Sequence, residues 1–490
     1  MTLSTLLLNV GIAAVLLSLV TEYLFKARKN WAVTFLQNYC GALFIFSGWV
    51  KAVDPLGTAY KMEQYFDQFE THFSWIGGLF PILSDYAISF SVFMIVFEIV
   101  LGLMLILGSS PRFTSWAFLL LVAFFTLLTG FTYLTGYLSG DATFFEFAQW
   151  GAYDKNNMKV TDCGCFGDYL KLEPKISFYK DLALLIPAIF FIFKFRDMHQ
   201  WFTPSARRTI NGVCVGALTV YCLGNFLWDI PGQDFRPFKV GVNVKAQKDI
   251  EEAALANVAI IGWVMENKET GEVVPVPNPA YKEVVAEYPK DKGWKVKDQM
   301  KSEPTLEPSK ISDFAVEDIE GNDVTEEILN MKGYSLMLVS YKMYYDGSKD
   351  EQKLFVDTLY VLDTITTADT MYTVRKPQSI KERTETVTSY TWNKDWEANY
   401  KNKVNPFANS AMKNGVTVYG IVGGAGTDMI NDFRTKNQIQ FPFYKADDIL
   451  LKTIVRSNPG MVLFKDGTIL KKWHINKLPS FEEVKAEFMK

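Results

Sequence analysis

Cysteine and histidine are scarce in this chain, and no cysteine occurs after Cys222. The 490 residues include five cysteines and three histidines. Lysine plus arginine (50) nearly balance aspartate plus glutamate (54), and no basic stripe interleaved with aromatic residues is present. A near-neutral charge gives no electrostatic basis for binding nucleic acid. The sequence therefore predicts no nucleic-acid partner, and it excludes thiol exchange by the second half of the chain.

Charged residues are rare in the first half of the chain, where long apolar runs dominate residues 1–228. Residues 229–490 have the composition of a charged, soluble chain. A membrane-spanning helix needs roughly 17–25 apolar residues. Six segments reach or approach that length: 3–25, 31–50, 86–108, 113–136, 181–195 and 209–228. The sequence thus predicts an α-helical membrane bundle of about six transmembrane helices, with the lipid bilayer as its partner, followed by a domain outside the membrane.

Lysine and arginine cluster in three of the short connections between these segments. They lie at 26–30, at 109–112 and at 194–208, in alternate connections. Because positive residues favour the cytoplasmic side, these connections are expected to be cytoplasmic. The loop 137–180 and the C-terminal half then lie outside the cytoplasm, where disulfides form.

The loop between the fourth and fifth segments contains the motif DCGCFGD at 162–168. Its thiols, Cys163 and Cys165, are one glycine apart, and a disulfide between them would be strained and therefore redox-active. Asp162 and Asp168 oppose thiolate formation. A purely structural disulfide is the alternative. A binding site for a soft metal ion, formed by the two thiolates, is a third option, although this loop offers only two thiols and no histidine.

Glu98 lies in the middle of the third apolar segment, where an ionised carboxylate is costly unless it is paired. It is a candidate proton relay or ligand contact, or else a neutral acid hydrogen-bonded to Asn38 or Ser47. Lys51 and Asp54 open the first outer loop. They are candidate cofactor contacts, with anchoring at the membrane surface as the alternative.

Several motifs carry a family resemblance. They are Phe46–Lys51 followed by Asp54-Pro55, Glu98 with Gly102-Leu103, and the cysteine loop 163–168. Together they resemble the DoxX/DoxD and MauE group of small membrane proteins over roughly residues 31–200. The resemblance implies a four-helix core of DoxX type in the cytoplasmic membrane of a bacterium. It also implies a redox role, in electron transfer to quinone or in the disulfide-dependent maturation of a periplasmic enzyme.

On this basis Cys163, Cys165 and Glu98 are the expected catalytic residues, Lys51 and Asp54 the expected cofactor contacts, and a quinone the expected cofactor. Quinone-linked disulfide-forming enzymes also have thiols at the outer end of a four-helix bundle. Those enzymes carry Cys-x-x-Cys, whereas this chain has Cys-x-Cys, so the likeness is architectural.

The soluble half is expected to contain two pieces, 229–310 and 311–490, after the membrane domain 1–228. In the first piece, apolar residues 260–265 and 272–276 flank a turn at 267–271 and predict a β-hairpin. A stretch rich in lysine and proline, 289–310, is expected to be a connector.

Residues 311–490 alternate strands and helices, which predicts a mixed α/β sheet. Strands are expected at 335–340, 416–422 and 441–444, helices at 427–438 and 447–456, and a hairpin at 461–470. This order resembles an extracytoplasmic thioredoxin-like domain, with Pro459 in the position of its cis-proline. The position of the usual Cys-x-x-Cys is occupied by 341–347, which has no cysteine. Residues 364–403 are expected to be an insertion.

Two functions remain open from the sequence. A membrane thiol-disulfide or quinone oxidoreductase fits the cysteine loop. A non-catalytic docking subunit of a cell-envelope assembly, secretion or motility complex fits the cysteine-free domain, which would bind a periplasmic protein partner through its proline loop. A transporter has little support, because no internal repeat stands out.

Overall fold

The computed structural model describes residues 2–138, 140, 142–160, 163–366 and 371–489. It divides the chain into two compact units, Met1–Arg236 and Pro237–Lys490. Asp162, which the sequence places beside Cys163, lies outside the described residues.

The first unit is helical, and among its described residues six helices are long and apolar enough to cross a membrane, as the sequence predicts. They are α1 (Leu3–Tyr23), α2 (Trp31–Val53), α5 (Ala87–Leu107), α6 (Pro111–Leu134), α7 (Pro174–Lys194) and α8 (Pro204–Leu223). The fifth span, α7, begins seven residues before the predicted start at 181. Lys180 and Asp181 end the apolar run in the sequence, but in the folded chain they pair with each other inside the helix.

The connection between α2 and α5, predicted as a loop, is also helical. It contains α3 (Pro55–His72), a 3₁₀ turn at Ser74–Leu79 and α4 (Phe80–Asp85). The Asp54 side chain accepts a hydrogen bond from Gly57 N, and Pro55 occupies the first turn, so the helix begins there for local reasons. One face of α3 is aromatic and packs against Phe131 of α6.

Helices α2 and α5 approach each other closely through glycine. A Cβ on Gly102 would lie 2.7 Å from the carbonyl oxygen of Gly41, and one on Gly48 would lie 2.4 Å from Cγ1 of Ile99. Larger residues would push the two backbones apart, as in other membrane helix pairs. This contact aligns Lys51 of α2 with Glu98 of α5.

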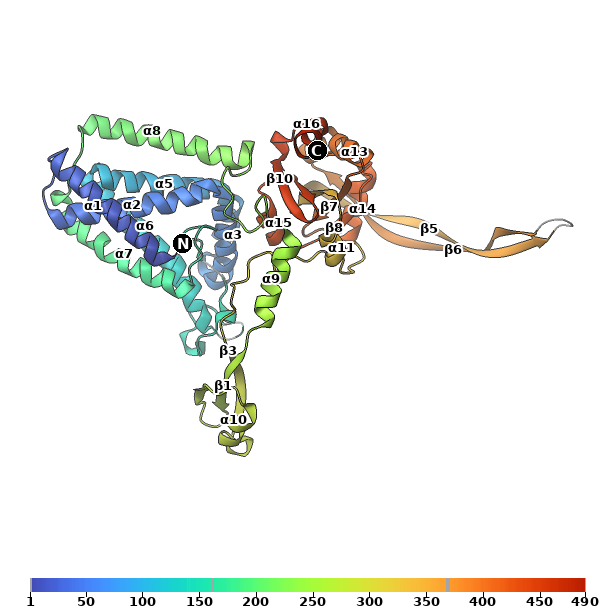
Figure 1. Cartoon of the computed structure of the whole chain (residues 1–490), viewed down its shortest axis with the longest axis horizontal. Helices are drawn as coiled ribbons and strands as arrows, with labels where there is room; N and C mark the ends of the chain where they lie inside the picture. Colours follow the sequence, from blue (N-terminus) through green and yellow to red (C-terminus); the bar gives the residue numbers. More distant parts are fainter. Residues whose placement is uncertain (1, 139, 141, 161–162, 367–370, 490) are drawn as a thin grey trace. The chain divides into compact units, whose positions relative to one another are not determined.

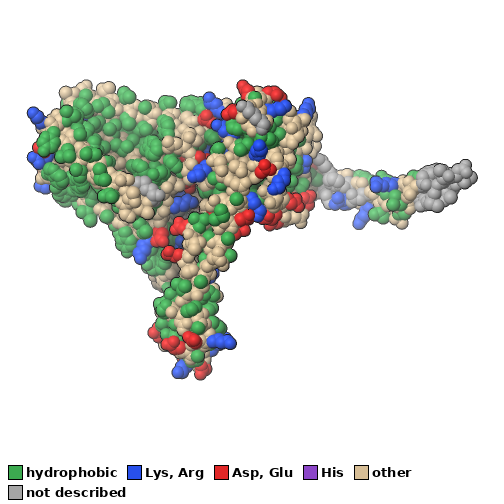
Figure 2. Space-filling model, in the orientation of Figure 1, with side chains coloured by type: hydrophobic (Ala, Val, Ile, Leu, Met, Phe, Trp, Pro, Cys, Tyr) green, Lys and Arg blue, Asp and Glu red, His purple; other side chains and the backbone are tan. Residues whose placement is uncertain are grey.

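The three basic connections meet at one end of the helical unit. Lys29 Nζ donates to the carbonyl of Arg196, the amide of Trp201 donates to Leu107 O, and Trp201 Nε1 donates to Thr21 Oγ1. Figure 2 shows lysine and arginine at this end and hydrophobic side chains along the helices. The arrangement agrees with the grouping predicted from the sequence, and the side of the membrane that this end faces stays a prediction.

The second unit contains a small sheet of order β2-β1-β3. The predicted hairpin is formed by β1 (Ile260–Asn267) and β2 (Val273–Val276). A third strand, β3 (Trp294–Lys301), pairs with β1 and lies in the stretch predicted to be a connector. Its alternating lysines face solvent, while Trp294 and Val296 pack on the sheet. The prediction of a connector is therefore wrong here, because the lysines belong to the solvent face of a strand.

The main sheet of this unit has five strands in the order β10-β9-β4-β7-β8. The strands are β4 (Tyr334–Ser340), β7 (Thr417–Val422), β8 (Phe443–Lys445), β9 (Gly460–Lys465) and β10 (Thr468–His474). Strands β4, β7 and β8 are parallel, β9 is antiparallel to β4, and β10 is antiparallel to β9. The predicted strands are confirmed, and the Asn458–Pro459 bond is cis as predicted.

Three helices of the second unit precede β4, and the others lie between the strands or follow them. They are α9 (Val244–Ala256), α10 (Tyr281–Glu287), α11 (Thr325–Leu329), α12 (Lys394–Asn399), α13 (Asn405–Lys413), α14 (Thr427–Lys436), α15 (Asp448–Ile454) and α16 (Phe481–Phe488). The predicted helices at 427–438 and 447–456 are confirmed as α14 and α15.

A long two-stranded ribbon projects from the second unit (Figure 1). Its strands are β5 (Tyr345–Thr366) and β6 (Met371–Trp392). The predicted insertion boundaries, 364–403, are therefore wrong at both ends. Trp392 and Trp396 are buried in the core, because the chain has already returned to the domain at these residues.

Candidate functional site: two buried ion pairs beside the cysteine loop

Lys51 and Glu98 form an ion pair inside the helical unit. Lys51 Nζ lies 2.8 Å from Glu98 Oε2 and 3.1 Å from Oε1, and it also donates to Ser47 Oγ at 3.3 Å. The side chains are only 7% and 2% exposed, and the Phe125 ring centroid lies 4.7 Å from Nζ. Lys51 is therefore not a surface anchor. Asn38, an alternative partner for Glu98, instead donates to Ser18 Oγ.

A second ion pair lies on α7, and sequence reasoning missed it. Lys180 Nζ is 2.5 Å from Asp181 Oδ1, and Thr129 Oγ1 of α6 donates to Asp181 Oδ2 at 3.0 Å. Asp181 is 2% exposed. Adjacent opposite charges at the start of an apolar segment were the available signal. In the sequence alone, such charges indicate the edge of a shorter span.

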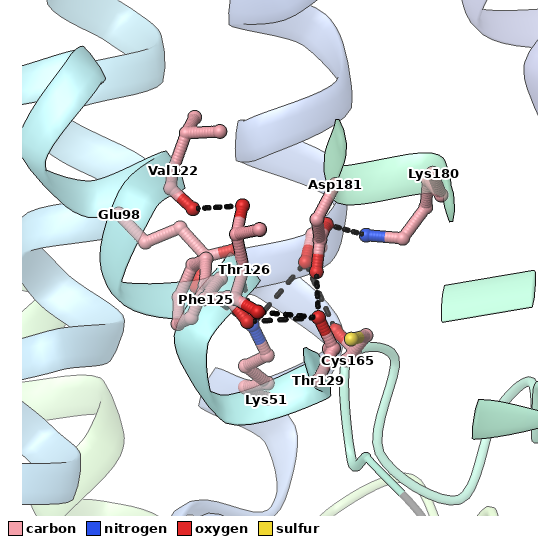
Figure 3. Close-up of polar contacts among 10 residues, drawn as sticks. Lys51, Glu98, Val122, Phe125, Thr126, Thr129, Cys165, Lys180 and Asp181 are labelled. Atoms are coloured by element: carbon pink, nitrogen blue, oxygen red, sulfur yellow. Dashed lines mark hydrogen bonds and ion pairs between the residues drawn. The ribbon is translucent and has the colours of Figure 1, made fainter. Parts of the chain in front are cut away.

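Cys165 lies beside these ion pairs (Figure 3). Its carbonyl accepts a hydrogen bond from Ser47 Oγ at 3.0 Å, so the loop is fixed to α2 one turn before Lys51. The next residue, Phe166, is buried among Leu6, Val10 and Leu43, and its ring also contacts Lys180 Nζ at 5.6 Å. The loop therefore rests on the same residues that build the charge cluster.

Glycine makes this turn possible. Gly164 and Gly167 have φ of +60° and +51°, and Gly167 N donates to Gly164 O at 3.1 Å. A side chain at either position would strain the backbone. The two glycines thus let Cys163 and Cys165 lie on a tight turn whose buried anchor is Phe166.

Burial raises the pKa of the Cys165 thiol above its ordinary value. The nearest charges act in opposite directions: Lys180 lowers this pKa, Asp181 raises it, Lys51 lowers it and Glu98 raises it. The thiol is therefore protonated near neutral pH, and formation of the thiolate requires a proton acceptor or a favourable local charge. All four charges of the two ion pairs influence this one sulfur.

The other predicted site residues occupy different positions. Cys163 is partly exposed on the same turn. Asp54 caps the first turn of α3 through its 3.2 Å contact with Gly57 N, three residues after Lys51. The structure brings Lys51, Glu98 and Cys165 together and gives Asp54 a helix-capping position. Cys165 is in the thiol form, so the disulfide to Cys163 stays a prediction.

The three remaining cysteines lie on membrane helices. Cys40 and Cys222 are buried among apolar side chains, and Cys214 is partly buried. Within the residues that the structure describes, no group of three or more histidine, cysteine or acidic side chains could hold a metal ion.

Residues 29–141 match the family model of methylamine utilisation protein MauE. The match includes Lys51, Glu98 and Thr129, and it ends before the cysteine loop and the Lys180–Asp181 pair. No curated protein and no solved structure matches the chain. Together with the six apolar helices, this match supports a MauE-like, multi-pass membrane protein, with the likeness confined to residues 29–141.

Proposed function

We propose that this MauE-like membrane protein is a thiol-disulfide oxidoreductase whose reacting groups are Cys163 and Cys165. In the first step, two thiols of a periplasmic protein partner reduce the Cys163–Cys165 disulfide and are themselves joined in a disulfide. The two loop thiols then lose two electrons and two protons to a membrane acceptor, and the loop disulfide forms again. The observation that supports this most is the electrostatic contact of Cys165 with two ion pairs buried in the helical domain.

The charge cluster has a role in each step of this reaction. Lys180, the charge that most favours the Cys165 thiolate, stabilises it when the disulfide is opened. Asp181 and Glu98 receive the protons that the thiols release, since each carboxylate lies within the cluster. Buried carboxylates paired with lysines serve as proton relays in membrane helices.

The surroundings of Lys51 fit a quinone. The ammonium group is a hydrogen-bond donor for a carbonyl oxygen, and the Phe125 ring offers an apolar face at 4.7 Å from Nζ. A bound quinone supplies a two-electron, two-proton acceptor. Lys51 would hold and orient it, and Asp54 keeps α3 in place next to Lys51.

The second unit would serve as the docking domain for the protein partner, on the periplasmic side of the inner membrane. The central strand order β7-β4-β9-β10, in which β7 pairs with β4 in parallel and β9 pairs with β4 and β10 in antiparallel fashion, supports a thioredoxin-like fold. The domain contains no cysteine, so it binds without exchanging thiols.

The redox state of the loop thiols tests the proposal. In a full-length chain carrying Cys40→Ser, Cys214→Ser and Cys222→Ser, only Cys163 and Cys165 react with an alkylating mass tag in intact membranes. We expect no tagging at rest, two tags after a reductant, and loss of tagging after a quinone is added. Thiols that stay reduced with quinone, or a pair that no reductant opens, would contradict electron transfer. Cys163→Ser supplies the control with one reactive thiol.

Removal of either charge next to Cys165 gives a second test, because the two substitutions should change the alkylation rate of Cys165 in opposite directions. In a Cys163→Ser background, Lys180→Met removes a charge that lowers the Cys165 pKa, so alkylation at fixed pH should slow. Asp181→Asn removes a charge that raises it, so alkylation should speed up. Rates measured from pH 7 to 10 separate a shifted pKa from altered access, because altered access changes the plateau rate. Equal effects from both variants would show that Lys180 and Asp181 do not control the thiol.

A docking subunit without redox chemistry is the second candidate, favoured by the cysteine-free α/β domain and its long ribbon. Cys163→Ser with Cys165→Ser separates the two functions. A redox protein loses its activity in the cell completely, whereas a docking subunit keeps it.

A further inference from the structure

A cavity of about 790 Å³ opens at the end of the helical unit where the three basic connections meet. Three cationic side chains line it, Lys29, Arg112 and Arg196, and no carboxylate does. They come from three separate segments: the turn before α2, the first turn of α6 and the turn after α7. Lys29 precedes α2, and Trp31 and Lys51 lie 20 residues apart on this helix, about 30 Å at 1.5 Å per residue, so this cavity is distinct from the cysteine site.

The turn that carries the cavity residue Gln200 is held by buried hydrogen bonds of its neighbour His199. Gln37 Nε2 donates to Leu105 O at 2.7 Å and to His199 O at 3.2 Å, and its Oε1 accepts from His199 N at 3.1 Å. Gly108 lies so close to this turn that a Cβ there would be 1.8 Å from His199 O. The segment that carries Arg196 and Gln200 is therefore fixed against the end of α5.

The positive charges of the cavity have no ion-pair partner among the residues that the structure describes. Over the described part of the chain, neither Arg112 nor Arg196 forms an ion pair with a carboxylate. The nearest acid in sequence, Asp197, faces Lys194 at 3.7 Å. Lys29 Nζ donates to Arg196 O at 3.1 Å, which holds the two cationic segments together. Arg112 also lies in the first turn of α6, where the helix dipole adds positive potential.

The apolar part of the lining is mainly aromatic and largely exposed. Phe113 and Trp116 are 57% and 50% exposed, and Phe195 completes the apolar lining. A neighbouring hollow of about 350 Å³ shares Arg112, Trp116, Phe195 and Arg196, and it continues to Ile192 of α7. A ligand that fills both spaces must carry a negative group at one end and an apolar chain at the other. Aromatic and basic residues at this depth are typical of the membrane interface.

We propose that this cavity binds an anionic phospholipid, with the phosphate between Arg112, Arg196 and Lys29 and an acyl chain along α6 and α7. Guanidinium groups bind phosphate oxygens in a bidentate manner, and basic pockets between membrane helices hold anionic headgroups. A free phosphate compound shares the headgroup chemistry but cannot use the aromatic walls.

The test is native mass spectrometry of the full-length protein in detergent, titrated with phosphatidylglycerol or with phosphatidylcholine. The wild type should bind one phosphatidylglycerol with clear preference. Arg112→Gln with Arg196→Gln removes two charge-assisted contacts, so its affinity should fall by about tenfold or more. Arg112→Lys with Arg196→Lys keeps both charges and should retain most of the binding, which separates loss of the site from loss of folding.

Arg208→Gln is the matched control, because Arg208 is an exposed cation at the same end of the protein that does not line the cavity. If this variant lowers binding as much as the double variant, general electrostatic attraction explains the binding and the proposal is wrong. Competition with glycerol 3-phosphate or inorganic phosphate at concentrations near that of the lipid would assign the site to a soluble phosphate compound. Equal binding of phosphatidylcholine would also overturn the proposal.

Discussion

The buried charges beside the cysteine loop are each paired with an opposite charge. Lys51 and Glu98 lie on different helices, so their contact also ties α2 to α5. The attraction within a buried ion pair offsets the free-energy cost of desolvating both groups only when the geometry is good. Removal of one partner leaves an uncompensated buried charge. Lys51 meets this condition with contacts to both carboxylate oxygens and to Ser47.

We expect Lys51→Met and Glu98→Leu each to destabilise the protein by about 3–5 kcal/mol, since each leaves the other charge buried alone. The double variant should be more stable than either single variant. Thermal unfolding in detergent measures this, and Lys194→Met, in a half-exposed pair, should change it little. Additive losses in the double variant would show that the two residues do not interact.

His199 is buried without a charged partner. Its Nε2 donates to Ile106 O at 2.8 Å, and its Nδ1 has no hydrogen-bond partner among the described residues. Burial lowers the pKa of His199 to about 4, the hydrogen bond to Ile106 opposes this shift, and the Lys29 charge adds to it. The imidazole is therefore neutral near pH 7.

Stability should depend on pH through His199. An unfolded histidine has a pKa of about 6.5, so between about pH 6.5 and 4 the unfolded chain binds a proton that the native state does not. The melting temperature should be level above pH 7 and should fall as pH drops through that window. His199→Gln keeps a donor to Ile106 but cannot titrate, so the wild type minus variant difference isolates this residue. An unchanged difference from pH 7 to 4.5 would contradict the assignment.

At the scale of secondary-structure elements, the ribbon β5–β6 exposes large apolar side chains along its outer part. Leu354, Leu362 and Ile380 are 60%, 66% and 65% exposed, although they are large and apolar. A two-stranded ribbon has no core of its own and is marginal in water. Its base is different: Trp392 is 4% exposed and donates through Nε1 to Asp432 Oδ2 at 2.8 Å. The base therefore belongs to the α/β domain, and the outer part does not.

Replacement of residues 350–388 by an Asn-Gly turn should leave the α/β domain folded. The expected change in its melting temperature is less than about 2 °C, since the deleted strands contribute little to the core. Trp392→Ala should instead cost about 3–5 kcal/mol, as expected for a buried tryptophan. Circular dichroism during heating compares the two variants. A large loss of stability in the ribbon deletion would show that the ribbon supports the fold.

At the scale of the whole molecule, the second unit begins well before its main sheet. Lys472 on β10 is 3% exposed, and its Nζ donates to Phe238 O at 2.6 Å and to Ile454 O at 3.0 Å. The segment near 241–243 also pairs with β10 through Gly241 N and Val242 O. Residues 237–243 are therefore part of this fold, although they are far from the sheet in the sequence.

A fragment of residues 237–490 should fold as a soluble domain with one cooperative transition. A fragment of residues 311–490 should be clearly less stable, because Lys472 loses the carbonyl of Phe238 and keeps a buried charge. Urea unfolding followed by tryptophan fluorescence measures both. Lys472→Met should recover part of the loss in the shorter fragment and not in the longer one. Equal stability of the two fragments would place the domain boundary at 311.

The sequence by itself determined the features that depend on neighbouring residues. Apolar runs located the six spans, basic residues grouped the three connections, and alternation with turn residues predicted the hairpin and most strands of the main sheet. These features follow from the hydrophobic effect and from backbone preferences over short windows. Where charged residues interrupt an apolar pattern, the local pattern predicts the wrong structure: at Lys180 it predicts a shorter helix, and along β3 it predicts a connector.

Only the tertiary structure decided which side chains form the site. Lys51 and Glu98 are 47 positions apart, and Thr129 and Asp181 are 52 apart. A lone glutamate in an apolar segment indicates that it has a polar partner. The sequence alone does not select this partner, because several polar residues could pair with the carboxylate. The glycine contacts between α2 and α5 and the turn anchored by Phe166 select the partners, because they determine which buried charges come within reach of one another and of Cys165.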